Sequence, residues 1–143
     1  MNKSETKKMV SLVLGVAILL AGVFFDDEYL TEPKILDGIM SKKIDYKGNP
    51  VDVTTTFSPE DTVYFSAKRN RFWIKKAQVV WYKGEIQKRN RFLVEKAVAI
   101  NKAGYFSSKL SVPEGLEEGH YSVTIYIDGS KIRETSVEFD VKK

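Results

Sequence analysis

The pattern of apolar and polar residues divides the chain into two unlike parts. From residue 9 to residue 25 the sequence reads MVSLVLGVAILLAGVFF, seventeen positions without a charged residue. Beyond Gly38 the apolar residues instead alternate with polar ones, in short runs separated by turn residues. A long uncharged run is typical of a membrane helix, and short alternating runs are typical of half-buried strands.

The uncharged run Met9–Phe25 predicts a helix that crosses a bilayer. At 1.5 Å per residue it spans roughly 25 Å, the short end of the range for a hydrocarbon core. A cleaved secretory signal is the alternative, but the run exceeds the usual apolar region of about 7–15 residues. Bulky Phe24 and Phe25 also extend the run where small residues would precede a cleavage site. We favour an uncleaved anchor over a cleaved signal, with a helix buried in a partner protein as a third interpretation.

Charges on either side of this run predict its orientation. Three lysines precede it, and three acidic residues, Asp26, Asp27 and Glu28, follow it directly. Since the basic side of a span stays in the cytoplasm, we expect the rest of the chain to lie outside a bacterial inner membrane, in the periplasm or beyond. The predicted organisation is a basic cytoplasmic tail, a single transmembrane helix, an acidic linker and a β-domain, at residues 1–8, 9–25, 26–38 and 39–143.

The outer segment reads as about seven or eight strands. TVYFSA alternates as a half-buried strand should, KAQVVWY places Ala77, Val79 and Trp81 on one face of a strand, and HYSVTIYI reads as a further strand. Lys83-Gly84 predicts a two-residue hairpin turn. Residues 85–100 fit either a strand or one helical face, and we favour the strand. The fold class predicted is all-β, an antiparallel sandwich of two sheets.

Two segments carry a resemblance to a known family. VVWYK places Trp81 in the middle of a strand, and LEEGHYSVTIYIDG places Tyr121 at the start of another some forty residues later. Over residues 39–143 the chain resembles the immunoglobulin-like modules of bacterial envelopes. The resemblance implies that Trp81 is the core tryptophan and Tyr121 the corner tyrosine of such a sandwich. It implies binding roles rather than one activity.

The pentapeptide KRNRF occurs twice, at Lys68–Phe72 and at Lys88–Phe92. Residues 68–91 hold nine basic residues and one acid, a net +8, whereas the rest of the chain from Asp26 holds 11 basic and 17 acidic residues, a net −6. A two-residue turn at Lys83-Gly84 would place both repeats at one end of the sandwich. We therefore expect one basic partner-binding patch, made of Lys68, Arg69, Arg71, Trp73, Lys75, Lys76, Lys88, Arg89 and Arg91.

Several partners suit such a patch. Arginine binds carboxylates and phosphates through paired donors. We favour an accessory or structural subunit that docks other protein subunits of a membrane complex. The alternative is a tethered module for an anionic polymer or lipid head groups. Nucleic acid is disfavoured by the outside location, and the basic residues could also serve only to discourage strand pairing at an edge.

The sequence offers little for catalysis. There is no cysteine, and the one histidine, His120, stands at a strand entrance where a surface position is expected. No phosphate-binding glycine loop and no histidine–carboxylate spacing typical of a metal site is present. We therefore expect no enzyme activity, no catalytic residue, no cofactor and no metal.

Overall fold

Strands dominate the part of the chain that the structure describes. The computed structural model describes residues 32–143, and within them the one helical element is a short 3-10 turn, η1. For these residues the prediction of an all-β fold is confirmed, with nine strands in place of seven or eight. Their bounds are β1 Ile35–Ile44, β2 Pro50–Val53, β3 Thr56–Phe57, β4 Val63–Arg69, β5 Lys76–Lys83, η1 Lys88–Asn90, β6 Arg91–Ala99, β7 Tyr105–Leu110, β8 Gly119–Ile127 and β9 Arg133–Val141.

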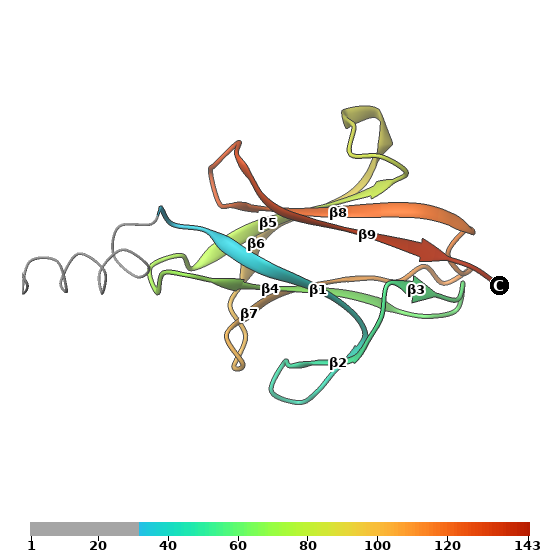
Figure 1. Cartoon of the computed structure of the whole chain (residues 1–143), viewed down its shortest axis with the longest axis horizontal. Helices are drawn as coiled ribbons and strands as arrows, with labels where there is room; N and C mark the ends of the chain where they lie inside the picture. Colours follow the sequence, from blue (N-terminus) through green and yellow to red (C-terminus); the bar gives the residue numbers. More distant parts are fainter. Residues whose placement is uncertain (1–31) are drawn as a thin grey trace, which may run out of the picture. The chain divides into compact units, whose positions relative to one another are not determined.

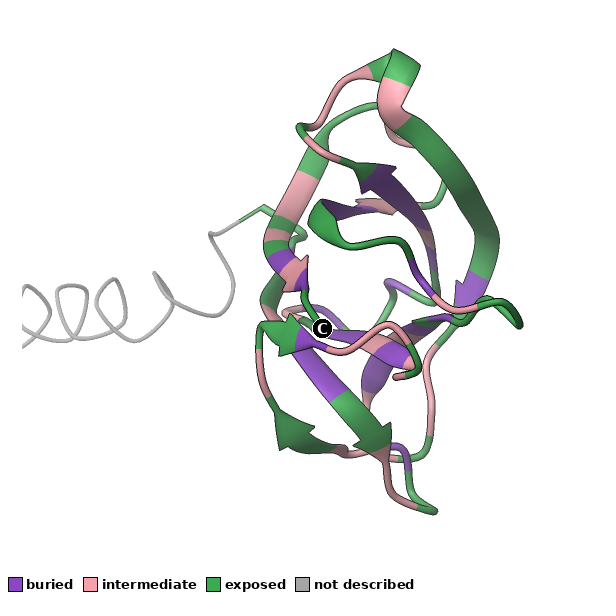
Figure 2. Cartoon of the chain, turned by 90° about the vertical axis from the view of Figure 1, so that its right-hand side faces the viewer, coloured by how far each residue is buried: buried purple, intermediate pink, exposed green. Residues whose placement is uncertain are grey.

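The strands form two sheets that pack face to face (Figure 1). One sheet has the order β2-β1-β4-β7 and the other the order β3-β9-β8-β5-β6. Neighbouring strands are antiparallel except for β3, which pairs with β9 in parallel. The expected two-sheet sandwich is therefore present. Figure 2 shows buried residues toward its interior and exposed residues along the outer strands.

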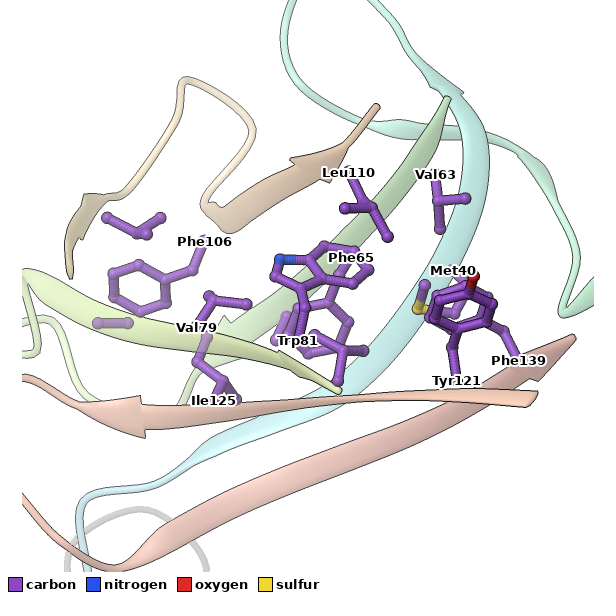
Figure 3. Close-up of a cluster of buried hydrophobic side chains, with 14 of the residues drawn as sticks. Met40, Val63, Phe65, Val79, Trp81, Phe106, Leu110, Tyr121, Ile125 and Phe139 are labelled. Atoms are coloured by element: carbon purple, nitrogen blue, oxygen red, sulfur yellow. The ribbon is translucent and has the colours of Figure 1, made fainter. Parts of the chain in front are cut away.

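The hydrophobic core lies between the sheets, around Trp81 (Figure 3). The side chain of Trp81 is fully buried, meets the ring of Phe139 edge-on at 5.9 Å and donates a 3.0 Å hydrogen bond from Nε1 to Ser108 Oγ. Tyr121 stacks on Phe139 with 5.3 Å between the ring centroids, and its hydroxyl donates to the backbone oxygen of Glu117 at 2.7 Å. The predicted burial of Trp81 and Tyr121 is confirmed.

Strand β5 is buried on both faces, whereas one buried face was predicted. Ala77, Val79 and Trp81 face the core as expected, but Val80 and Tyr82, on the opposite face, are also buried. The bulky side chain of Tyr82, with the guanidinium of Arg91 6.0 Å from its ring, lies on this outer face. The prediction used only the spacing of Ala77, Val79 and Trp81, whereas the unbroken apolar run from residue 79 to residue 82 is the pattern of a strand buried on both faces.

The domain begins earlier than predicted. Strand β1 starts at Ile35, inside the expected linker 26–38, because the fully buried Ile35 pairs with Arg69 of β4. Gly38 lets β1 approach the other sheet, since a Cβ there would lie 2.7 Å from Val137 Cγ2. The predicted tail, the predicted transmembrane helix and residues 26–31 of the linker lie outside the described residues. Between residues 32 and 143, no helix has the length and apolar character needed to span a membrane.

The connection from β5 to β6 corrects one prediction. The chain does not turn back at Lys83-Gly84; Gly84 N donates to His120 O of β8 at 2.7 Å, and the loop continues through η1. Tyr82 then pairs with Arg91, and Lys76 pairs with Ala99. A two-residue turn would instead have paired Lys76 with Arg91. For residues 85–100, the favoured strand is confirmed at Arg91–Ala99.

Candidate interaction surfaces

The first KRNRF repeat ends β4 and forms the first half of the loop to β5, and arginines of the repeat hold that loop in place. Arg69 Nη1 donates to the backbone oxygens of Phe72 at 2.7 Å and Ile74 at 3.0 Å. The Ile74 side chain is buried beneath the loop. Arg71, expected to contact a partner, is only 8% exposed, and its guanidinium lies 5.8 Å from the ring centroid of Trp73. Both arginines therefore contact other residues of the loop and hold its conformation.

The tip of this loop presents two large apolar side chains to solvent. Phe72 is 76% exposed and Trp73 is 53% exposed, and their rings meet edge-on at 5.3 Å. Lys75 and Lys76 beside them are also exposed, and Lys68 lies over the ring of Tyr105. Exposed aromatic side chains flanked by cations are typical of a contact surface rather than of a solvated turn.

The second repeat lies in another environment. Lys88 and Arg89 belong to η1 and are exposed, while Arg91 opens β6 beside Tyr82. Asn90 closes the preceding loop by donating from Nδ2 to Glu85 O at 2.9 Å. This segment is therefore a compact cap on the far end of β5.

The two repeats lie at opposite ends of β5, so the prediction that they form one patch is wrong. Lys76, at the first repeat, and Lys83, at the second, are the two ends of that strand. Seven steps of about 3.3 Å place these ends roughly 23 Å apart. Figure 1 shows the β4–β5 loop at the left of the sandwich and the β5–β6 loop at the upper right. The nine residues therefore divide into two groups: Lys68, Arg69, Arg71, Trp73, Lys75 and Lys76, and separately Lys88, Arg89 and Arg91.

Strand β6 is a surface that the sequence reasoning missed. It is the last strand of its sheet and is exposed at eight of its nine positions (Figure 2). Phe92, Leu93 and Val94 stand in sequence on it with 45%, 37% and 40% of their surface exposed. Three consecutive apolar residues in a strand place apolar side chains on both of its faces, and this run was the feature of the sequence that could have indicated the surface. An open apolar edge is a template for pairing with another chain.

A pocket of about 600 Å³ opens beside β7, between the β1–β2 and β6–β7 turns. Glu95 of β6 contributes a carboxylate to the pocket lining, and this carboxylate accepts a 2.5 Å hydrogen bond from Ser108 Oγ. Asn101 ties the two turns together by donating from Nδ2 to Gly48 O at 3.0 Å. The polar groups here hold turns and the Trp81 side chain in place, so the pocket lining has an evident structural role.

His120 is at the surface, as expected. Its Nδ1 lies 2.8 Å from Asp140 Oδ1, and its Nε2 lies 3.7 Å from Glu138 Oε1. The hydrogen bond to Asp140, together with the charges of both carboxylates, raises the pKa of His120 above its ordinary value. Among residues 32–143, no group of three His, Asp or Glu side chains is placed to hold a metal ion.

No known family model matches the chain, and no curated protein sequence matches it either.

Proposed function

We propose that this chain is a membrane-anchored, outward-facing accessory subunit of a bacterial envelope complex. In this proposal the sandwich binds a protein partner and performs no catalysis. The single observation that carries it is the open strand β6, where Phe92, Leu93 and Val94 are exposed in a row. Arg89 and Arg91 beside this row suit a partner that presents carboxylates.

The proposed anchor is the run Met9–Phe25, in the inner membrane as a single span. Its support is the absence of charge over seventeen residues, with lysines before and acids after. The domain from Pro33 to Lys143 is a compact unit with its own hydrophobic core, which suits it to stand outside on a tether.

We further propose that the sandwich is immunoglobulin-like. The sheet orders support this, because β4 and β7 share one sheet while β9, β8 and β5 share the other, as do strands B and E and strands G, F and C of that fold. In this proposal Trp81, buried on β5, is the core tryptophan, and Tyr121, whose hydroxyl bonds four residues upstream, is the corner tyrosine. Such sandwiches carry many binding roles.

The partner-binding proposal is tested by purifying the tagged full-length protein in mild detergent and identifying its companions by mass spectrometry. Val94→Lys places a charge on the β6 edge, and Val53→Lys, on β2 of the other sheet, is the matched control because Val53 is 67% exposed. We expect a specific companion to be lost with Val94→Lys and kept with Val53→Lys, while both variants melt near the wild-type temperature. Identical companions for all three proteins would refute docking through β6.

A further inference from the structure

We infer that the β4–β5 loop, residues 70–75, is a lipid-binding element that docks the domain on an anionic membrane surface. In this arrangement Phe72 and Trp73 enter the headgroup region, and the lysines beside them contact lipid phosphates. The inference rests on the proposed anchoring of the chain, because it assigns the bilayer itself to this loop. The protein partner is left to the exposed row Phe92–Val94 of β6, which lies beside the half of β5 farther from this loop.

The first argument is chain length. Asn70 is joined to the point where the chain enters the domain: Asn70 N donates to Lys34 O at 3.0 Å, and Lys34 N donates to Asn70 Oδ1 at 2.7 Å. Lys34 follows Phe25, the last residue of the uncharged run, by nine positions. Nine residues reach at most about 30 Å when fully extended. Lys34 is therefore within that distance of the end of the proposed span, and the loop begins beside Lys34 at Asn70.

The second argument is a neighbouring loop of the same chemistry. Asp128 N donates to Lys76 O at 3.1 Å, so the β8–β9 loop lies at the same end of the sandwich, as Figure 1 shows at its left. In this loop Ile132 is 73% exposed and stands between exposed Lys131 and Arg133. Two separate loops thus present exposed apolar side chains flanked by cations. Aromatic side chains with lysine and arginine are the residues that anchor proteins at membrane interfaces.

The third argument is charge. Residues 68–76 and 127–133 together hold seven basic residues and one acid, Asp128. An anionic leaflet attracts each such cation near its surface by an amount equal to about a fivefold change in binding. The clamp of Arg69 on the loop backbone fixes the aromatic tip before it meets a membrane, so little ordering entropy opposes docking. A lipid surface is the partner that accepts both the charge and the apolar tip.

The test uses the full chain in vesicles of phosphatidylcholine with or without phosphatidylglycerol, carrying lipids brominated near the head groups. The protein has two tryptophans, and Trp81 is fully buried, so lipid quenching of emission reports Trp73. We expect quenching with a blue shift in anionic vesicles, little in neutral ones, and none in Trp73→Phe. Lys75→Gln with Lys76→Gln should lower the ratio of docked to undocked loops about 25-fold.

The matched control is Lys142→Gln with Lys143→Gln, which removes two exposed charges at the C-terminal end and should leave quenching unchanged. Absence of quenching in anionic vesicles, or equal quenching in the Lys75/Lys76 and Lys142/Lys143 variants, would overturn the inference. Persistent access of Trp73 to aqueous acrylamide would overturn it too, because the loop would then be left open for a protein or polymer. Alkaline extraction of the vesicles tests the anchor separately: a released chain refutes anchoring, and quenching at neutral pH still decides the role of the loop.

Discussion

Replacing Trp81 with alanine tests the core most directly. The side chain is fully buried, packs edge-on against Phe139, and is held by Ser108, whose hydroxyl is held in turn by Glu95. Truncation removes the indole contacts and leaves a cavity between the sheets. Substitutions of this kind cost about 3–5 kcal/mol. Small domains have only about 5–15 kcal/mol of stability, so the loss is at least about a fifth of the total.

The expected effect is measurable in two ways. For a domain of about 110 residues, each kcal/mol lowers Tm by about 4 °C, so Trp81→Ala should lower it by roughly 12–20 °C. A urea titration of residues 33–143, followed by far-ultraviolet circular dichroism because the variant loses an indole signal, should give a lower midpoint with an unchanged slope.

Trp73→Ala is the control, because that tryptophan is 53% exposed and its removal should change stability by no more than about 0.5 kcal/mol. A loss below about 1 kcal/mol for Trp81→Ala, at an unchanged slope, would show that Trp81 does not fill the core. Similar losses for the two variants would refute the contrast between their environments.

Three further changes test other parts of the structure. Tyr121→Phe should cost about 1 kcal/mol in chemical denaturation, since it removes a single backbone hydrogen bond, and no measurable loss would count against that bond. Asp140 raises the pKa of His120, so the protonated pair stabilises the fold fully below the ordinary pKa of 6.5, and this stabilisation is lost as the pH rises through the raised pKa. His120→Gln should flatten this decline of stability with pH, and an unaltered pH profile would show that the decline comes from another group. Gly38→Ala should destabilise the fold by about 1–3 kcal/mol through overpacking against Val137. Adding Val137→Ala should recover part of this lost stability, whereas additive losses from the two changes would show that residues 38 and 137 are not in contact.

Local pattern predicted the elements of the fold better than their connections. The spacing of Ala77, Val79 and Trp81 identified the core-facing side of β5, and the position of Tyr121 after a glycine identified a buried tyrosine, because both depend on residues close in sequence. The length of the β5–β6 turn did not follow from Lys83-Gly84. Gly84 bonds to the backbone of His120, thirty-six residues later, and no local rule contains that contact.

The candidate surfaces were predictable in composition but not in position. The sequence placed Trp73 in the expected contact patch, and the structure exposes it. It could not reveal that Arg71 turns inward, because an arginine is buried only where a packed loop supplies partners for its donors. Nor could it reveal that β6 is an edge strand, since an edge strand is defined by the neighbour that is missing. An error in a turn moves every cross-strand partner: Lys76 pairs with Ala99, eight residues beyond the Arg91 that the assumed hairpin would give, so that hairpin carried the second repeat to the wrong end.

The way the chain enters the sandwich has a mechanical consequence. Strand β1 begins at the entry point, beside the end of β4, and runs antiparallel to it from the Ile35–Arg69 pair to the Ser41–Tyr64 pair. Tension applied at Lys34 and resisted at the opposite end of the domain acts along the strand axis. The ladder hydrogen bonds lie across that axis, so they share the force and must break together rather than one after another. Because forced rupture is governed by the unfolding rate, this geometry should let the domain hold a pulled tether far longer than a peeled strand would.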